Sequence, residues 1–240
     1  MVAFNNSSNG SEAAQVSSLT YSFTVNSGNN RLLLVGTVTY QNSNPHTISA
    51  ITFNGDSLTN FNSVVWGGGE DDRNELWRMV APDVATGNVV ITPSATPCDI
   101  ISGAVAYDDV DQTTPLDGSQ TATVGTTATS ITLTITSAVN DLAFGMVGGF
   151  DKAAITVGAG QTQRFERETN DFSNIHGSEE PGAASVTWTT SWTNGSSSPL
   201  GANGGNINNA PAGGRTTLNT LAAPLGSHLG RGLWTHGGSG

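Results

Sequence analysis

The side chains best suited to chemistry are carboxylates gathered in two acidic stretches of the sequence. Carboxylate oxygens are ligands that Ca²⁺ binds, although neither spacing matches an EF-hand loop. The calcium candidates are Glu70, Asp71, Asp72, Asp108, Asp109 and Asp111. We expect residues 70–72 to belong to a solvated loop and residues 108–111 to form a turn before Pro115, because Asp side chains accept bonds from backbone N–H groups in turns. No cofactor is therefore expected, and calcium is the alternative.

Two further carboxylates have a spacing that glycosidases use. Glu166 and Glu168 fall on one face of a predicted strand, about 7 Å apart by strand rise, and glycoside hydrolysis needs two carboxylates at separations of roughly this size. Arg164 and Arg167 are interspersed with them, and such patterns are usually exposed ion pairs. The sequence contains no H-x-H or H-E-x-x-H pair and no G-x-S-x-G motif, so we expect no enzyme.

Aromatic side chains and sequons raise the question of sugars. The tryptophans that could stack on a sugar ring are Trp66, Trp77, Trp188, Trp192 and Trp234. Trp66 borders a glycine run and could be exposed, whereas Trp77 and Trp188 alternate with polar residues as core side chains do. The glycosylation candidates, all in predicted polar turns, are Asn5, Asn6, Asn9 and Asn194. Carbohydrate binding therefore remains an alternative function.

Composition narrows the classes of partner. The formal net charge is -11 with only 8 Lys plus Arg, which argues against nucleic acid, and no apolar run reaches the ~18 residues that a membrane helix needs. Charged residues make up 11% of the chain, far below the usual share of about 25%, and Thr, Ser, Asn and Gly supply the polar surface. This composition predicts an extracellular or cell-surface protein. No export signal is visible at the start, which favours a virion as the alternative location.

The spacing of apolar residues predicts strands and hardly any helix. Residues 19–25 and 129–136 alternate as half-buried strands do, while residues 31–40, 99–107 and 141–150 are continuously apolar, as in covered strands. Turn signals recur about every ten residues, which favours an antiparallel sandwich or jelly roll. No repeat of about 20 to 50 residues is evident. We predict one all-β, antiparallel, jelly-roll-like β-sandwich over residues 1–193, followed by a Gly/Asn-rich tail over residues 194–240.

Four stretches in order carry a resemblance to a known type of module. They are LTYSFTVNSGNNRLLLVGTVTY, ISAITFNGDSLT, ELWRMVAPDVATGNVVIT and AVAYDDVDQTTPLDG. Together they resemble a jelly-roll-type module of large bacterial surface and extracellular proteins and of some phage-associated ones. The resemblance covers about residues 2–193 and implies a β-sandwich and an extracellular setting. Such modules close with a further apolar strand soon after the tryptophan strand, and this sequence departs from that pattern after Trp192.

The tail suggests how copies could join. Residues 194–214 have the composition of a linker, and apolar residues return beyond them. An edge left open at the tryptophan strand would accept a strand from another chain. The candidate subunit contacts are Val186, Trp188, Trp192, Leu218, Leu221, Leu225, Leu229, Leu233 and Trp234. Closure of the sandwich by its own tail is the competing interpretation.

These observations predict a non-catalytic structural subunit that self-assembles into a pilus-like extracellular filament, with itself as partner in a homopolymer. A head-to-tail contact that does not close on itself generates such a filament. The alternatives are a carbohydrate-binding or adhesion module of a surface protein, with glycans as partners, and a structural component of a virion or phage tail. Neither nucleic acid nor membrane insertion is expected.

Overall fold

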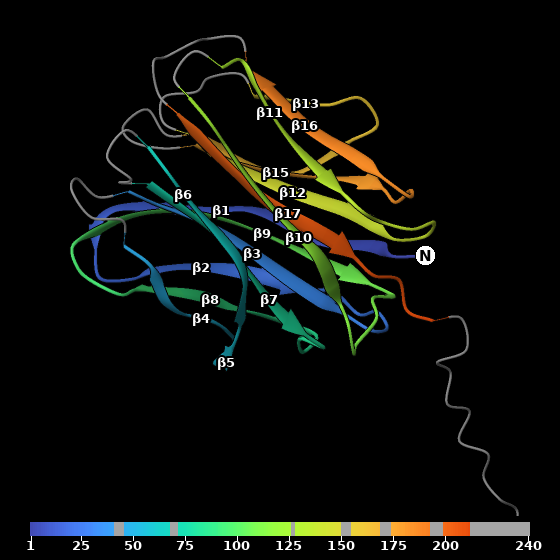
Figure 1. Cartoon of the computed structure of the whole chain (residues 1–240). Coiled ribbons are helices and arrows are strands. Elements are labelled where there is room, and N and C mark those ends of the chain that lie inside the picture. The colour runs from blue at the N-terminus through green and yellow to red at the C-terminus, as the bar shows by residue number, and fades with distance from the viewer. Residues whose placement is uncertain are drawn as a thin grey trace, which may run out of the picture.

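The computed structural model describes residues 1–40, 46–67, 72–125, 128–149, 155–168, 174–192 and 199–211. Within these ranges the chain forms strands and no helix (Figure 1), and every strand pair is antiparallel. The predicted all-β antiparallel class is confirmed. A helix able to cross a membrane is thus not found in the described part of the chain.

Four sheets divide between the two halves of the sequence. Inner sheet 1 has the order β1-β9-β3-β7-β6 and outer sheet 1 the order β2-β8-β4-β5. Their strands are β1 (Ala3–Val16), β2 (Leu19–Val25), β3 (Leu32–Tyr40), β4 (Ile48–Phe53), β5 (Asp56–Ser57), β6 (Thr59–Trp66), β7 (Asp72–Val80), β8 (Ala85–Pro93) and β9 (Cys98–Asp108).

The second half of the chain builds the other two sheets. Inner sheet 2 has the order β10-β17-β12-β15-β14 and outer sheet 2 the order β11-β16-β13. Their strands are β10 (Leu116–Val124), β11 (Ser130–Ile135), β12 (Leu142–Gly149), β13 (Ile155–Val157), β14 (Thr162–Glu168), β15 (Asn174–Pro181), β16 (Val186–Trp192) and β17 (Leu200–Ile207).

The sheets stack as four layers, with outer sheet 1 and outer sheet 2 on opposite sides (Figure 1). Three apolar clusters fill the spaces between them. Phe23 and Leu33 belong to the cluster between outer and inner sheet 1, Leu34 and Phe144 to the cluster between the two inner sheets, and Trp188 to the cluster between inner and outer sheet 2. Both inner sheets are therefore covered on both faces, which explains their continuously apolar strands.

The two halves have the same strand order. Replacing β1, β9, β3, β7 and β6 by β10, β17, β12, β15 and β14 converts inner sheet 1 into inner sheet 2, and β2-β8-β4 becomes β11-β16-β13 in the same way. Registers agree too: Leu32 pairs with Val80 and Tyr107, as Leu142 pairs with Pro181 and Ile207. The described residues thus repeat one arrangement of strands in the two halves of the chain.

Local irregularities are duplicated as well. The β6–β7 ladder has a register shift between Asn60 and Asn62, and the β14–β15 ladder has one between Gln163 and Phe165. A β-bulge puts two residues opposite one on the partner strand, so the strand bends at the corresponding point in each half. The described strands therefore form two stacked pairs of sheets that pack through their inner sheets, where one sandwich was predicted from the sequence.

The strand predicted to be missing is present. Residues 200–207, predicted to belong to a linker, form β17, and β17 lies between β10 and β12 in inner sheet 2. Its glycines suit the site because a Cβ on Gly201 would lie 2.1 Å from Cδ1 of Trp66. A Gly-rich strand is thus accepted where a neighbouring side chain already fills the space.

The predicted boundary at residue 193 and the predicted open edge are therefore wrong. The described fold extends through β17 to Asn209, which bridges to Val110, and β16 lies between β11 and β13 rather than at an edge. Residues 212–240, with the candidate contacts Leu218, Leu221, Leu225, Leu229, Leu233 and Trp234, lie outside the described residues.

Candidate functional site

The candidate subunit contacts of β16 point into the protein's own core. Val186, Trp188 and Trp192 are buried, Nε1 of Trp188 donates to Oγ of Ser178 at 2.9 Å, and Nε1 of Trp192 donates to the Ala128 carbonyl at 3.0 Å. They already have their partners within one chain. The interpretation of these tryptophans as contacts under a neighbour's strand is wrong.

The second acidic stretch builds turns. Oδ1 of Asp111 accepts hydrogen bonds from the N–H groups of Thr113 at 2.7 Å and Thr114 at 3.0 Å. Both bonds lower the pKa of Asp111, and the bond from Thr114 has the larger effect. The carboxylate of Asp108 accepts from Nδ2 of Asn5, and Asp109 has a positive φ of 58°, as in a turn.

The calcium candidates that the structure describes, Asp72, Asp108, Asp109 and Asp111, do not come together as one metal-binding group. Glu70 and Asp71 lie outside the described residues, and Asp72 is buried on β7. Across the described ranges, no three His, Cys, Asp or Glu side chains lie close enough together to hold a metal ion.

The tryptophans of the first half are also core residues. Trp66 is 3% exposed and its Nε1 donates to Oδ1 of Asn74 at 2.7 Å, while Nε1 of Trp77 donates to Oε2 of Glu75 at 2.9 Å. A sugar needs an accessible ring face to stack on. The expectation that Trp66 could be exposed is therefore wrong, and Trp234 lies outside the described residues.

Three of the four sequons lie in β1 rather than in turns. The Asn5 amide bonds to Asp108, as above, and Nδ2 of Asn6 donates to the Thr24 carbonyl at 2.7 Å. Asn9 is exposed and its Oδ1 accepts from the N–H of Glu166 at 3.1 Å. Asn194 lies outside the described residues. Of the three described sequons, Asn9 has the most accessible side chain.

Buried titratable groups lie within the layers. Burial lowers the pKa of His176 on β15 to about 4, and burial, followed by the charge of Asp99, raises the pKa of Cys98 to about 12. A general acid or base works best with a pKa near the working pH. Neither group is poised for proton transfer at neutral pH.

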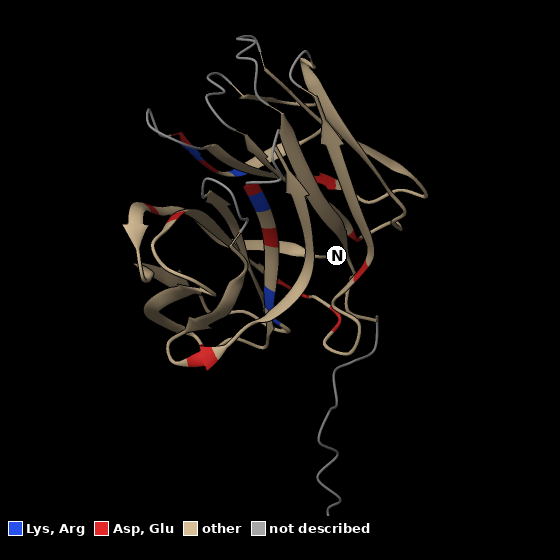
Figure 2. Cartoon of the chain, turned by 60° about the vertical axis from the view of Figure 1, so that its left-hand side comes forward, with Lys and Arg blue, Asp and Glu red and all other residues tan. Residues whose placement is uncertain are grey.

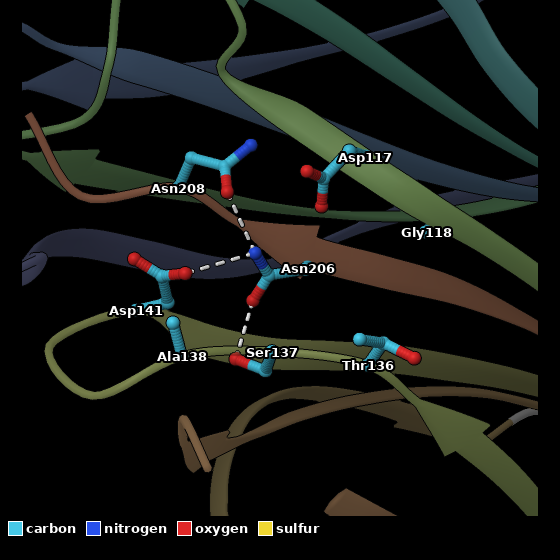
Figure 3. A pocket seen from close by; sticks show the side chains of 8 residues that line it. All are labelled: Asp117, Gly118, Thr136, Ser137, Ala138, Asp141, Asn206 and Asn208. Carbon is cyan, nitrogen blue, oxygen red and sulfur yellow. Dashed lines mark hydrogen bonds between the residues drawn. The ribbon is translucent and has the colours of Figure 1, made fainter. Parts of the chain in front are cut away.

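A pocket of about 320 Å³ opens at one end of the second sandwich. Its lining residues come from β10, from β17 and the segment directly after it, and from the connection between β11 and β12; they are Asp117, Gly118, Thr136, Ser137, Ala138, Asp141, Asn206 and Asn208. Figure 3 shows Asn206 at the centre of the polar contacts. Its Nδ2 donates to Asp141 at 3.0 Å and to Asn208 at 2.8 Å, and its Oδ1 accepts from Ser137. These groups hold β17 against the β11–β12 connection.

The equivalent place in the first half is filled. Asp117 pairs with Asn206 as Asn6 pairs with Ala106, and Asn5 lies at the register shift between Phe4 and Asn6. In the first half Asn5 donates to Asp108, and a Cβ on Gly28 would lie 2.1 Å from that carboxylate. The pocket is therefore a place where the two copies of the sandwich have diverged.

The outer sheets are the other candidate surfaces, and among their described strands only β5 carries a charge, that of the exposed Asp56 at the rim. Strands β2, β4 and β8 on one side and β11, β13 and β16 on the other contain no Asp, Glu, Lys, Arg or His. In Figure 2 the charged residues lie on the inner sheets, in the connections and on β5 at the rim. In a chain with a net charge of -11, two uncharged faces on opposite sides are unusual, because exposed strands ordinarily carry charges that oppose association.

Hydroxyl groups take the place of charges there. Residues of β11 alternate buried and exposed, so that Ser130, Thr132 and Thr134 point outward; they pair across the strands with Ser191, Thr189 and Thr187 of β16. Hydroxyls of Thr132 and Thr189 lie 3.0 Å apart. The corresponding residues of β2 are Thr20, Ser22 and Thr24, and Thr24 bonds to Thr86 of β8 at 2.8 Å. The column of three hydroxyl residues on β2 thus corresponds to that on β11, while the partners of the β2 column on β8 are Val90, Asn88 and Thr86.

Comparisons with protein-family models, with curated proteins and with solved structures gave no match. The resemblance to a surface-protein module stays a prediction. The function is therefore proposed from the contacts and surfaces of this chain.

Proposed function

We propose that this protein is a non-catalytic structural subunit that associates with copies of itself into an extracellular fibre or appendage. The observation that carries the proposal is a pair of hydroxyl-bearing faces on opposite sides of one four-layer block, without a charged residue on β2, β4 and β8 or on β11, β13 and β16. A block with two such faces can be extended in both directions. An extracellular setting is also part of the proposal, and a virion is its closest variant.

We further propose that each sandwich is a jelly roll. In that topology the first strand pairs with the last and the second with the one before the last. The pairs β1–β9 and β2–β8 follow this rule, and so do β10–β17 and β11–β16. Jelly rolls are frequent in capsid and lectin domains, so this topology suits a building block and does not by itself select one assembly.

The mode of association differs from the one predicted from the sequence. A strand donated by a neighbour requires an unfilled position, and β17 fills the position that the sequence left open. Contacts between sheet faces need no such vacancy. They are therefore the better basis for assembly of the described fold.

The full-length chain tests the proposal directly. Sedimentation velocity over a concentration series, with negative-stain images at about 0.15 M ionic strength, is expected to show linear multimers that grow with concentration. A chain that remains monomeric at every concentration and salt level would contradict the proposed function.

A further inference from the structure

We infer that the two outer faces are the surfaces through which copies of this chain contact one another, with outer sheet 1 of one copy seated on outer sheet 2 of the next. The inference rests on the proposed function and deepens it by naming the contact. Its starting point is the hydroxyl column that both faces share, in β2 and in β11.

Hydroxyl faces are self-complementary in a way that charged faces are not. A Ser or Thr hydroxyl has one donor hydrogen and two acceptor lone pairs, so a hydroxyl on one copy can satisfy a hydroxyl on another. A carboxylate only accepts and would be left unpaired against its own kind. A second copy is therefore a partner for which this surface chemistry is suited.

The distribution of charge also favours a second copy of this chain as the partner and the outer faces as the place of contact. Two copies, each with a net charge of -11, repel one another, and the repulsion is weakest where no carboxylate enters the contact. On the described strands, contact through β2, β4 and β8 or through β11, β13 and β16 meets that condition. Contact through the rim would bring Asp56 of β5 into the interface.

The arrangement of the faces selects the order of stacking. A head-to-tail stack repeats one contact, outer sheet 1 on outer sheet 2, and such a heterologous contact leads to an open filament. An alternating stack needs two different contacts, each complementary to itself. Because the two faces carry equivalent columns and lie on opposite sides, one repeated contact is sufficient.

The size of the contact sets the conditions of the test. Outer sheet 2 is three strands wide in the described residues, with strands about 4.8 Å apart, so each contact is small. We expect association to be measurable only at high protein concentration and to strengthen as salt screens the net charge.

The experiment places charges at equivalent points of the two faces of the full chain. Variant one carries Thr132→Lys and Thr189→Lys, which are cross-strand neighbours on outer sheet 2; variant two carries Ser22→Glu and Asn88→Glu, the equivalent neighbours on outer sheet 1. A control carries Thr113→Lys and Thr114→Lys in an exposed turn. Urea unfolding checks that each variant is folded.

Association measured by sedimentation is expected to weaken about tenfold or more in variant one. The two lysine ammonium groups would lose water at the contact and would find no opposite charge on the facing sheet of the next copy. Variant two should weaken likewise, and the control should match the unmodified chain. The variant that combines all four face substitutions should recover association, because Lys then faces Glu at every head-to-tail contact.

Three results would overturn the inference: folded single-face variants that associate as strongly as the unmodified chain, failure of the combined variant to recover, or a monomer that uses these faces to bind an insoluble neutral polysaccharide. The first two, obtained while the unmodified chain still forms multimers, leave the proposed function standing. Absence of multimers from the unmodified chain removes both.

Discussion

The indole ring of Trp66 leaves no room for a side chain at position 201, which is a glycine. A Cβ there would come within 2.1 Å of Cδ1 of Trp66, and that ring is fixed by its hydrogen bond to Asn74. The Asn74 amide in turn donates to the Gly201 carbonyl at 2.7 Å. The Asn74 amide, the Trp66 ring and the Gly201 backbone thus form one connected contact between the two inner sheets.

Gly201→Ala is expected to destabilise the protein by about 1–3 kcal/mol, the usual result of overpacking a well-filled core. Urea unfolding followed by far-UV circular dichroism measures it. The matched control is Gly125→Ala, where an added Cβ meets nothing within 4 Å. Equal midpoints for the two variants would contradict the close packing of β17.

His176 makes stability depend on acid. It is 0% exposed on β15, and burial lowers its pKa from 6.5 to about 4. The unfolded chain therefore binds a proton that the folded chain excludes, so the stabilising effect is present above pH 6.5 and is lost as the pH falls towards 4.

His176→Leu is expected to remove this dependence, which amounts to at most about 1.4 kcal/mol per pH unit. The measurement is urea unfolding at pH 7, 5.5 and 4.5 for both chains. A variant whose stability falls with pH as steeply as that of the unmodified chain would show that other groups cause the acid sensitivity.

At the scale of elements, β17 completes inner sheet 2. It pairs with β10 on one side and β12 on the other, and Asn203 on β17 donates to Asn62 of β6 at 2.9 Å. A central strand satisfies backbone groups of two neighbours, so its loss would leave both ladders unpaired.

Chains truncated after residue 211 and after residue 192 test this directly. The longer chain keeps every described strand and is expected to unfold at nearly the urea concentration of the full chain. The shorter chain lacks β17 and is expected not to fold, as seen in the loss of protection from hydrogen exchange. A folded, soluble chain ending at residue 192 would show that the domain closes without β17.

The sequence predicts strands correctly where apolar side chains alternate with polar ones or form a continuous run. Alternation in residues 19–25 and 129–136 predicted half-buried strands where the structure has β2 and β11, and the apolar run at residues 99–107 predicted a covered strand where the structure has β9. Backbone pairing explains the failure at β17, because LGANGGNI lacks the apolar side chains that reveal a buried strand.

Neither the repeated strand order of the two halves nor the position of the two outer faces was predicted from the sequence. The repeat spans about half of the described fold, so its period is longer than the roughly 20 to 50 residues of solenoid and propeller repeats. The signal lay in turns: Asn30 and Asn140, each just before an apolar strand, share a positive φ. The hydroxyl columns could be read from TSITLTIT, but only the layer order shows that they lie on opposite outer sides.

The whole molecule is held together across its inner sheets. The apolar cluster between them includes Leu34, Phe144 and Phe165, Nδ2 of Asn62 donates to the Gly204 carbonyl at 2.9 Å, and Arg167 pairs with Glu12 at 3.0 Å. Neither half can expose its inner face to water without losing this burial.

Heat is therefore expected to unfold both halves together. Calorimetry should show one transition whose measured enthalpy equals the van't Hoff enthalpy, the criterion of two-state unfolding. Two resolved transitions, one for each half, would mean that the contact between the inner sheets adds little to stability.

The duplicated inner sheets also have a consequence for synthesis. Residues before β10 leave the ribosome first, and their inner face then has no cover until the second half follows. Because both halves share one strand order, the first half of one chain can be covered by the second half of another. Domain-swapped dimers are the expected by-product of refolding at high concentration, and dilution should suppress them.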